Sequence, residues 1–138
     1  MESSNGEQQI DLLLRQDFPK SFRLLSAKDF QQVFAQAQKF ANRHWTFIVR
    51  PNNQVIPRLG LALSKKQLAK SVWRNRVKRI ARESFRQHKQ DLCGYDIVVL
   101  GRRGMEQVDG LTLSKSFAHL INKVRVSDLK HQQVKEQA

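Results

Sequence analysis

The sequence has a single cysteine, Cys93, in 138 residues. One cysteine excludes an intramolecular disulfide framework and a cysteine-rich zinc site, and it is typical of proteins of a reducing cytosol. Long apolar runs are absent from the amino-terminal part, where Ile10 and Leu12 to Leu14 are too few for a signal peptide core or a membrane span. We therefore expect a cytoplasmic protein with no membrane contact.

Acidic residues are also scarce, with 12 against 25 lysines and arginines. Holding two Mg²⁺ ions about 4 Å apart for phosphodiester cleavage needs clustered carboxylates or histidines. The four histidines, His44, His88, His119 and His131, are scattered without a ligand spacing. The sequence likewise shows no Ser/His/Asp or Cys/His arrangement, so we predict no catalytic residue and no metal site in the protein itself.

Positive charge is what the sequence has in excess, and it is concentrated in one segment. Residues 64–89 carry +9 of the formal net charge of +13. Their ten basic residues are Lys65, Lys66, Lys70, Arg74, Arg76, Lys78, Arg79, Arg82, Arg86 and Lys89, against one acid, Glu83. A polyanion is the natural partner of such a segment.

The spacing inside this segment predicts an amphipathic helix over Asn75 to Lys89. One face carries the stripe Val77, Ile80, Ala81, Ser84 and Phe85, and the opposite arc carries Asn75, Lys78, Arg79, Arg82, Arg86 and Lys89. A solvated basic face is the ordinary alternative. The shortage of Glu/Lys pairs and the excess of arginine over lysine favour phosphate binding instead.

The remaining pattern predicts a mixed α/β fold in the order α-β-β-β-α-β-α, with a four-stranded sheet. We expect a helix from Ser26 to about Gln38, strands at Trp45–Val49, Gln54–Pro57 (a short edge strand), Leu59–Leu63 and Tyr95–Leu100, and a last helix from Thr112 to Val124. Residues 18–126 should form one domain, with a flexible tail at 1–17 and a polar tail at 127–138.

Several of these residues resemble a known family. Arg74-Asn75-Arg76, followed by Lys78-Arg79 and Arg82-Glu83-Ser84-Phe85-Arg86, resembles the Arg-Asn-Arg signature of the protein subunit of bacterial ribonuclease P. Further matching pieces occur in order, namely Phe18-Pro19-Lys20 with Arg23-Leu24, Asp29-Phe30 with Val33-Phe34, Arg58-Leu59-Gly60-Leu61 before Ser64-Lys65-Lys66, and Asp96-Ile97-Val98-Val99 before a basic turn. The chain departs from the pattern at Gln67 to Lys70, where many members have a glycine.

The resemblance implies an α/β sandwich in which the basic helix belongs to a left-handed βαβ crossover, an uncommon connection. It also implies an accessory subunit of an endoribonuclease whose catalytic RNA removes the 5′ leader of precursor tRNA. The expected partners are the catalytic RNA and the leader, with no DNA. No cofactor is expected on the protein, and Mg²⁺ would be required by the RNA partner.

The resemblance further assigns two groups of site residues. The residues expected to bind the catalytic RNA are Arg74, Asn75, Arg76, Lys78, Arg79, Arg82 and Arg86, with Arg74 at the helix start, where free N–H groups also favour a phosphate. The expected leader cleft, between the sheet and the first helix, comprises Phe30, Phe34, Trp45, Phe47, Lys65, Lys66 and Lys70. Phe30 and Phe34 would fit a buried core equally well, whereas for Trp45 and Phe47 the core is the favoured interpretation.

The sequence leaves open two other classes of RNA-binding protein and the role of Trp73. A structural ribosomal-type RNA-binding protein would explain the size and charge, although not an aromatic-lined cleft. Gly101-Arg102-Arg103-Gly104 matches the loop of a K-homology-like module, but that loop should join two helices and here it follows a buried strand. Trp73 could pack under the loop before the signature or stack on RNA.

Overall fold

The computed structural model describes residue 23, residues 27–35 and residues 37–127. The tail predicted at residues 1–17, and residues 128–138 of the other tail, lie outside this range. The elements are α2 (Ala27–Ala35), β1 (Gln38–Ala41), β2 (Thr46–Pro51), β3 (Arg58–Ala62), α3 (Ser71–Gln87), β4 (Tyr95–Leu100) and α4 (Gly110–Val126), with 3₁₀ helices η2 (Lys89–Leu92) and η3 (Met105–Gln107).

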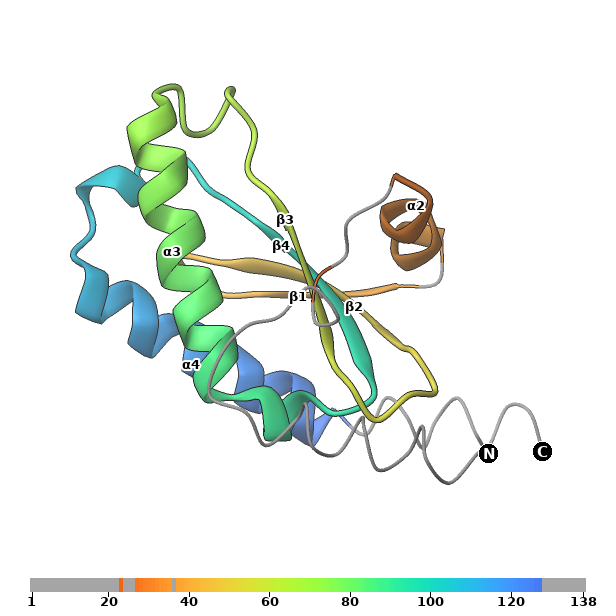
Figure 1. Ribbon diagram of the computed structural model, residues 1–138. Helices are drawn as coiled ribbons and strands as arrows, with labels where there is room; N and C mark the ends of the chain where they lie inside the picture. The colour runs from red at the N-terminus through yellow and green to blue at the C-terminus, as the bar shows by residue number, and fades with distance from the viewer. Residues whose placement is uncertain (1–22, 24–26, 36, 128–138) are drawn as a thin grey trace.

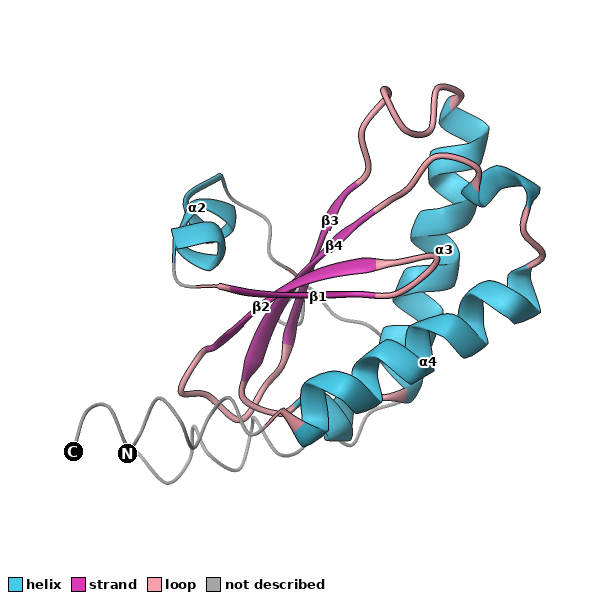
Figure 2. Ribbon diagram, turned by 180° about the vertical axis from the view of Figure 1, so that it is seen from behind, coloured by secondary structure: helices cyan, strands magenta, loops and turns pink. Residues whose placement is uncertain are grey.

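The four strands form one mixed sheet in the order β1-β2-β4-β3. β1 and β4 run antiparallel to β2, whereas β3 and β4 are parallel neighbours joined through α3. Helices α3 and α4 cover one face of the sheet, and α2 lies on the other (Figure 1). Figure 2 shows the same arrangement from behind. The predicted fold class, element order and number of strands are therefore confirmed.

One helix end and one strand are predicted wrongly. The first helix ends at Ala35, and Gln38–Ala41 forms the edge strand β1. Gln54–Pro57, expected as the edge strand, forms no strand because Asn52 folds this segment into a turn, accepting from Gln54 N–H at 2.9 Å and donating to Ile56 O at 3.0 Å. Pro57 also lacks the N–H that strand pairing needs.

The basic helix is longer at its amino end than the periodicity predicts. It begins at Ser71, so Arg74 is its fourth residue and not its cap, and it ends at Gln87. Lys89, expected on the cationic arc, lies in η2 and is only 3% exposed. Four of the five residues of the predicted apolar stripe, Val77, Ala81, Ser84 and Phe85, are buried, and the fifth, Ile80, is partly buried against the core.

The hydrophobic core lies between the sheet and the helix pair α3 and α4. Trp45 and Phe47 are fully buried there, with edge contacts to Phe117 of α4 at centroid distances of 5.1 and 4.8 Å. The Trp45 indole donates to Leu113 O at 2.9 Å. Their assignment to the leader cleft is therefore wrong, because both rings face α4 and not α2. The core interpretation of these two residues is confirmed.

Candidate nucleic-acid interface

The outer face of α3 forms a basic groove of about 380 Å³. Its lining residues are Arg23, Asn75, Lys78, Arg79, Arg82, Glu83 and Arg86. The helix buries Val77 and Phe85 on one side, and 100° per residue then turns Asn75, Arg79 and Arg82 outward, where they are exposed. Five of the six predicted catalytic-RNA residues from Asn75 to Arg86 therefore converge on one surface, with Arg76 the exception.

Arg23 is a member of this groove that the helical periodicity could not reveal. It lies far from α3 in sequence and forms a parallel bridge with Leu59 of β3. That pairing carries its side chain to the α3 groove, where it joins Lys78, Arg79, Arg82 and Arg86. The only signal in the sequence was the resemblance of Arg23-Leu24 to a family segment.

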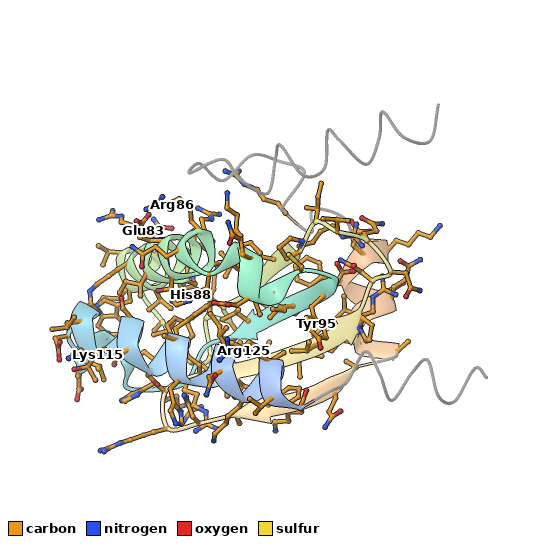
Figure 3. All side chains as sticks on the ribbon, turned by 90° about the horizontal axis from the view of Figure 1, so that it is seen from below. Glu83, Arg86, His88, Tyr95, Lys115 and Arg125 are labelled. Carbon is orange, nitrogen blue, oxygen red and sulfur yellow. The ribbon has the colours of Figure 1, made fainter. Side chains whose placement is uncertain are left out.

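One ion pair partly neutralises the positive charge of the groove. Glu83 accepts hydrogen bonds from Arg86, with Nε to Oε2 at 3.1 Å (Figure 3). These bonds lower the pKa of Glu83 and raise that of Arg86. The one acid of residues 64–89 is therefore paired with an arginine. The side chains of Arg79 and Arg82 make no hydrogen bond or ion pair to any residue in the described part of the chain.

The two arginines of the Arg-Asn-Arg signature hold the protein's own backbone. Arg74 Nη1 donates to Leu68 O at 2.8 Å and to Ala69 O at 3.0 Å. Arg76 Nη2 donates to Val108 O at 2.7 Å, across 32 residues of sequence. Only Asn75, between them, is exposed and lines the groove. The structure thus differs from the expectation that the Arg74 guanidinium faces a phosphate at the helix start.

The opposite face of the sheet lies beneath α2. Val33 of α2 is buried against Val98 of β4, and Phe30, Ile48, Ala62 and Leu100 are among the partly buried residues around this pair. Phe34, one turn after Phe30, is 50% exposed. Phe30 therefore packs on the sheet, Phe34 presents half of its surface to solvent, and a leader contact at either ring stays a prediction.

Residues 63–70, here called the lysine loop, connect β3 to α3. Lys65, Lys66 and Lys70 are all exposed. Leu68 is fully buried, and it closes a turn in which its N–H donates to Ser64 O at 3.0 Å. Leu68 thus anchors the loop to the hydrophobic core.

Trp73 packs under the lysine loop. Its side chain contacts the core, and the Lys70 ammonium lies 5.1 Å from the centre of its ring. Of the two roles left open for Trp73, the structure shows packing.

A buried ionic network lies on the α2 side of the sheet and was not expected. Asp96 of β4 is 0% exposed. It accepts from Arg58 of β3 (2.8 and 2.7 Å), from Arg50 of β2 (3.2 and 3.0 Å) and from Asn52 (2.9 Å). Arg58 also lies 3.9 Å from Asp29 of α2, so the network joins three strands and a helix.

The network sets the ionisation of its members. Burial alone opposes the charged form of Asp96, but the hydrogen bonds from Arg58, Asn52 and Arg50 outweigh it, and the pKa of Asp96 falls below its ordinary value. The hydrogen bond to Asp96 raises the pKa of Arg58 in turn. A lone aspartate inside an apolar strand was the available signal for this network.

A second basic hollow, of about 230 Å³, lies where the turn after β1 meets the loop after β4. It is lined by Arg43, His44, Arg102, Arg103, Gly104, Met105 and Val108. Arg102 joins the two segments by donating to Thr46 Oγ1 at 3.4 Å and to Arg43 O at 3.3 Å. The Gly-Arg-Arg-Gly loop leads from β4 into η3, and a K-homology loop would instead join two helices.

Two further observations concern the described residues only. Their His, Cys, Asp and Glu side chains include no group of three or more that could hold a metal ion. None of their helices is long and apolar enough to span a membrane.

The sequence of the chain matches known proteins of one family. The ribonuclease P family model matches residues 18–125. The chain is 41% identical over 103 residues to the ribonuclease P protein component of Photorhabdus laumondii, covering 75% of this chain and 87% of that protein. It is 45% identical over 91 residues to that of Vibrio cholerae, covering 66% and 77%.

The chain belongs to the ribonuclease P protein family. Solved structures agree with this. The ribonuclease P protein of Staphylococcus aureus has a TM-score of 0.68 at 30% identity, covering 75% of this chain and 94% of that one. That of Thermotoga maritima has a TM-score of 0.67 at 30% identity, covering 73% and 96%.

Family membership confirms the role that the resemblance implied. Ribonuclease P is an endoribonuclease that forms the 5′ ends of tRNA, and the protein is the accessory subunit of its ribonucleoprotein, with catalysis by the RNA subunit. The structural ribosomal-type alternative is therefore set aside.

Proposed function

We propose that the chain assists leader removal through two RNA-binding surfaces on different sides of the fold. The groove on α3 would bind the catalytic RNA through Asn75, Lys78, Arg79, Arg82 and Arg86. The sheet face beside α2, with Phe30 and Phe34, and the lysine loop, with Lys65, Lys66 and Lys70, would bind the precursor tRNA leader. The single observation that carries the proposal is the basic groove, whose lining holds five cations and one acid.

Charge is the chemical contribution of the α3 groove. Its guanidinium groups would neutralise phosphates of the catalytic RNA, and arginine suits this because its planar fork can contact two phosphate oxygens. Arg74 and Arg76 would contribute mainly by holding the groove and its neighbouring loops in place, since each donates to backbone carbonyls. The protein would bind no cofactor, and Mg²⁺ would be held by the RNA partner.

The leader surface must bind RNA of many different sequences, because leaders differ from one tRNA to another. Stacking on an aromatic ring tolerates any base and contributes about 1–3 kcal/mol per base. The exposed half of Phe34 could provide such a platform, and the three exposed lysines of the lysine loop could follow the backbone.

Reconstitution tests the proposal as a whole. The chain alone, the catalytic RNA alone and the two together would be assayed for mature tRNA 5′ ends at low Mg²⁺. We expect cleavage from the mixture and neither from the chain alone nor, at this Mg²⁺ concentration, from the RNA alone. Cleavage by the chain alone, or no gain on adding it to the RNA, would contradict the proposal.

Phe34→Ala should weaken binding of leader-bearing precursor tRNA by roughly fivefold to a hundredfold, the loss of one stacked base. Binding of leaderless tRNA should not change, because the lost contact belongs to the leader. The measurement is the dissociation constant of each RNA for the reconstituted holoenzyme. Phe34→Tyr is the matched control, since it keeps the ring. An equal loss for both RNAs would argue against a leader contact at Phe34.

A further inference from the structure

We infer that Arg74 is a positioning residue that holds the lysine loop in the conformation that binds the leader, and that it makes no phosphate contact with the catalytic RNA. The inference rests on the proposed function of that loop. Arg74 would then have a different role from Arg79 and Arg82, which belong to the same extended signature and line the groove.

The Arg74 guanidinium clamps two backbone carbonyls of the lysine loop. One nitrogen of Arg74, Nη1, donates both of its hydrogens to successive carbonyls, Leu68 O at 2.8 Å and Ala69 O at 3.0 Å. Neither carbonyl accepts a backbone hydrogen bond from a residue that the structure describes. The guanidinium therefore supplies the partner for two acceptors at the bend where the lysine loop turns into α3.

Apart from the Arg74 side chain, the helix holds this bend through the N–H groups of Trp73 and Arg74, which donate to Lys70 O. Residues 63–70 include neither glycine nor proline, so no special backbone residue sets their conformation. The turn at Ser64 and the buried side chain of Leu68 fix the first part of the loop. Arg74 fixes the second part, directly before Lys70, whose ammonium lies over Trp73.

The clamp helps to determine where the lysines point. Leu68 is turned into the core, and Arg74, in the first turn of α3, holds the carbonyls of Leu68 and Ala69. Lys70 is thereby left on the exposed side, together with Lys65 and Lys66 in the part of the loop that the Ser64 turn fixes. A flexible loop would lose conformational entropy on binding the leader, whereas a clamped loop has already lost it. Arg74 would in this way connect the helix that binds the catalytic RNA with the loop that binds the substrate.

The test compares Arg74→Ala with Arg79→Ala, which removes the same charge from an outward position on the same helix. For Arg74→Ala we expect the preference for leader-bearing over leaderless tRNA to fall by roughly fivefold to tenfold, the scale of the net contribution of one intramolecular hydrogen bond. Its log–log salt slope for binding catalytic RNA should stay at the wild-type value. For Arg79→Ala that slope should fall by roughly 0.7–0.9, and the leader preference should persist.

Limited trypsin digestion of the free protein provides an independent readout. Arg74→Ala should accelerate cleavage after Lys65, Lys66 and Lys70, and Arg79→Ala should not. Should the alanine variant fold poorly, Arg74→Gln keeps the aliphatic stem, cannot reach both carbonyls, and gives the same comparison.

Two results would overturn the inference. One is a salt slope that falls in Arg74→Ala as it does in Arg79→Ala, which would show a phosphate contact. The other is wild-type leader preference together with wild-type loop cleavage. If the wild-type protein shows no leader preference at all, the proposed leader surface fails, and the rate of loop cleavage alone then decides whether Arg74 is a clamp.

Discussion

Asp96→Asn is expected to lower the free energy of unfolding by about 3–5 kcal/mol, the cost of breaking a buried charge pair from one side. Asp96 is fully buried and accepts from Arg50, Asn52 and Arg58. An asparagine is neutral and turns an amide N–H₂ toward these donors. Arg50 and Arg58 would then face each other without their shared counter-charge. Urea unfolding of the wild type and the variant measures the difference.

The same substitution should change the response to acid. The pKa of Asp96 in the folded protein is below its ordinary value, so its contribution is complete above the unfolded pKa of about 3.9 and is lost as the pH falls through the folded pKa. Stability of the wild type should therefore decrease more steeply below about pH 4 than that of Asp96→Asn. The exposed Asp91 offers the control, since Asp91→Asn should change stability by less than about 1 kcal/mol. Equal stability losses at Asp96 and Asp91 would contradict this account of the network.

Arg79→Ala combined with Arg82→Ala is expected to weaken binding to the catalytic RNA by roughly tenfold to a hundredfold. Both side chains are exposed and line the α3 groove, and a net contribution of about 0.5–1.5 kcal/mol from each phosphate contact gives a loss of this size for two contacts. The log–log salt slope should also fall by roughly 0.7–0.9 for each contact removed. Filter binding or fluorescence anisotropy over a range of salt concentrations measures both quantities.

Lys115→Ala with Lys123→Ala is the matched control, because it removes the same charge from exposed positions on α4. Figure 3 shows Lys115 apart from the Glu83 and Arg86 pair on α3. If the groove makes local contacts, the α4 variant should lose much less affinity than the α3 variant. Equal losses would show that net charge, and not the groove, drives binding. Unchanged affinity in the α3 variant would rule out the proposed surface.

Structural features that depend on residues close together in the sequence could be predicted from the sequence. The cationic arc and its apolar stripe follow from a 3.6-residue period, so Asn75, Arg79 and Arg82 could be placed outward without coordinates. The continuous apolar run of β4 predicts a strand covered on both sides, and Ile97, Val98 and Val99 are buried as that predicts. The family followed from the residues around Arg74-Asn75-Arg76.

Contacts between residues distant in the sequence could not be predicted in this way. The choice of Gln38–Ala41 over Gln54–Pro57 as edge strand depends on pairing with β2 and on the Asn52 turn. A period of two places Phe47 and Ile48 on opposite faces of β2, but it does not say which face receives α4 and which receives α2.

The sequence by itself determined the charge, the class of partner, the fold class and the family of this protein, because these depend on composition, local periodicity and motif spacing. Only the tertiary structure decided which aromatics are core, where Asp96 finds its counter-charges, and that Arg74 and Arg76 face backbone carbonyls. The physical reason is that a side chain's direction is set by its own helix or strand, whereas what it meets there is set by chain segments brought together in folding.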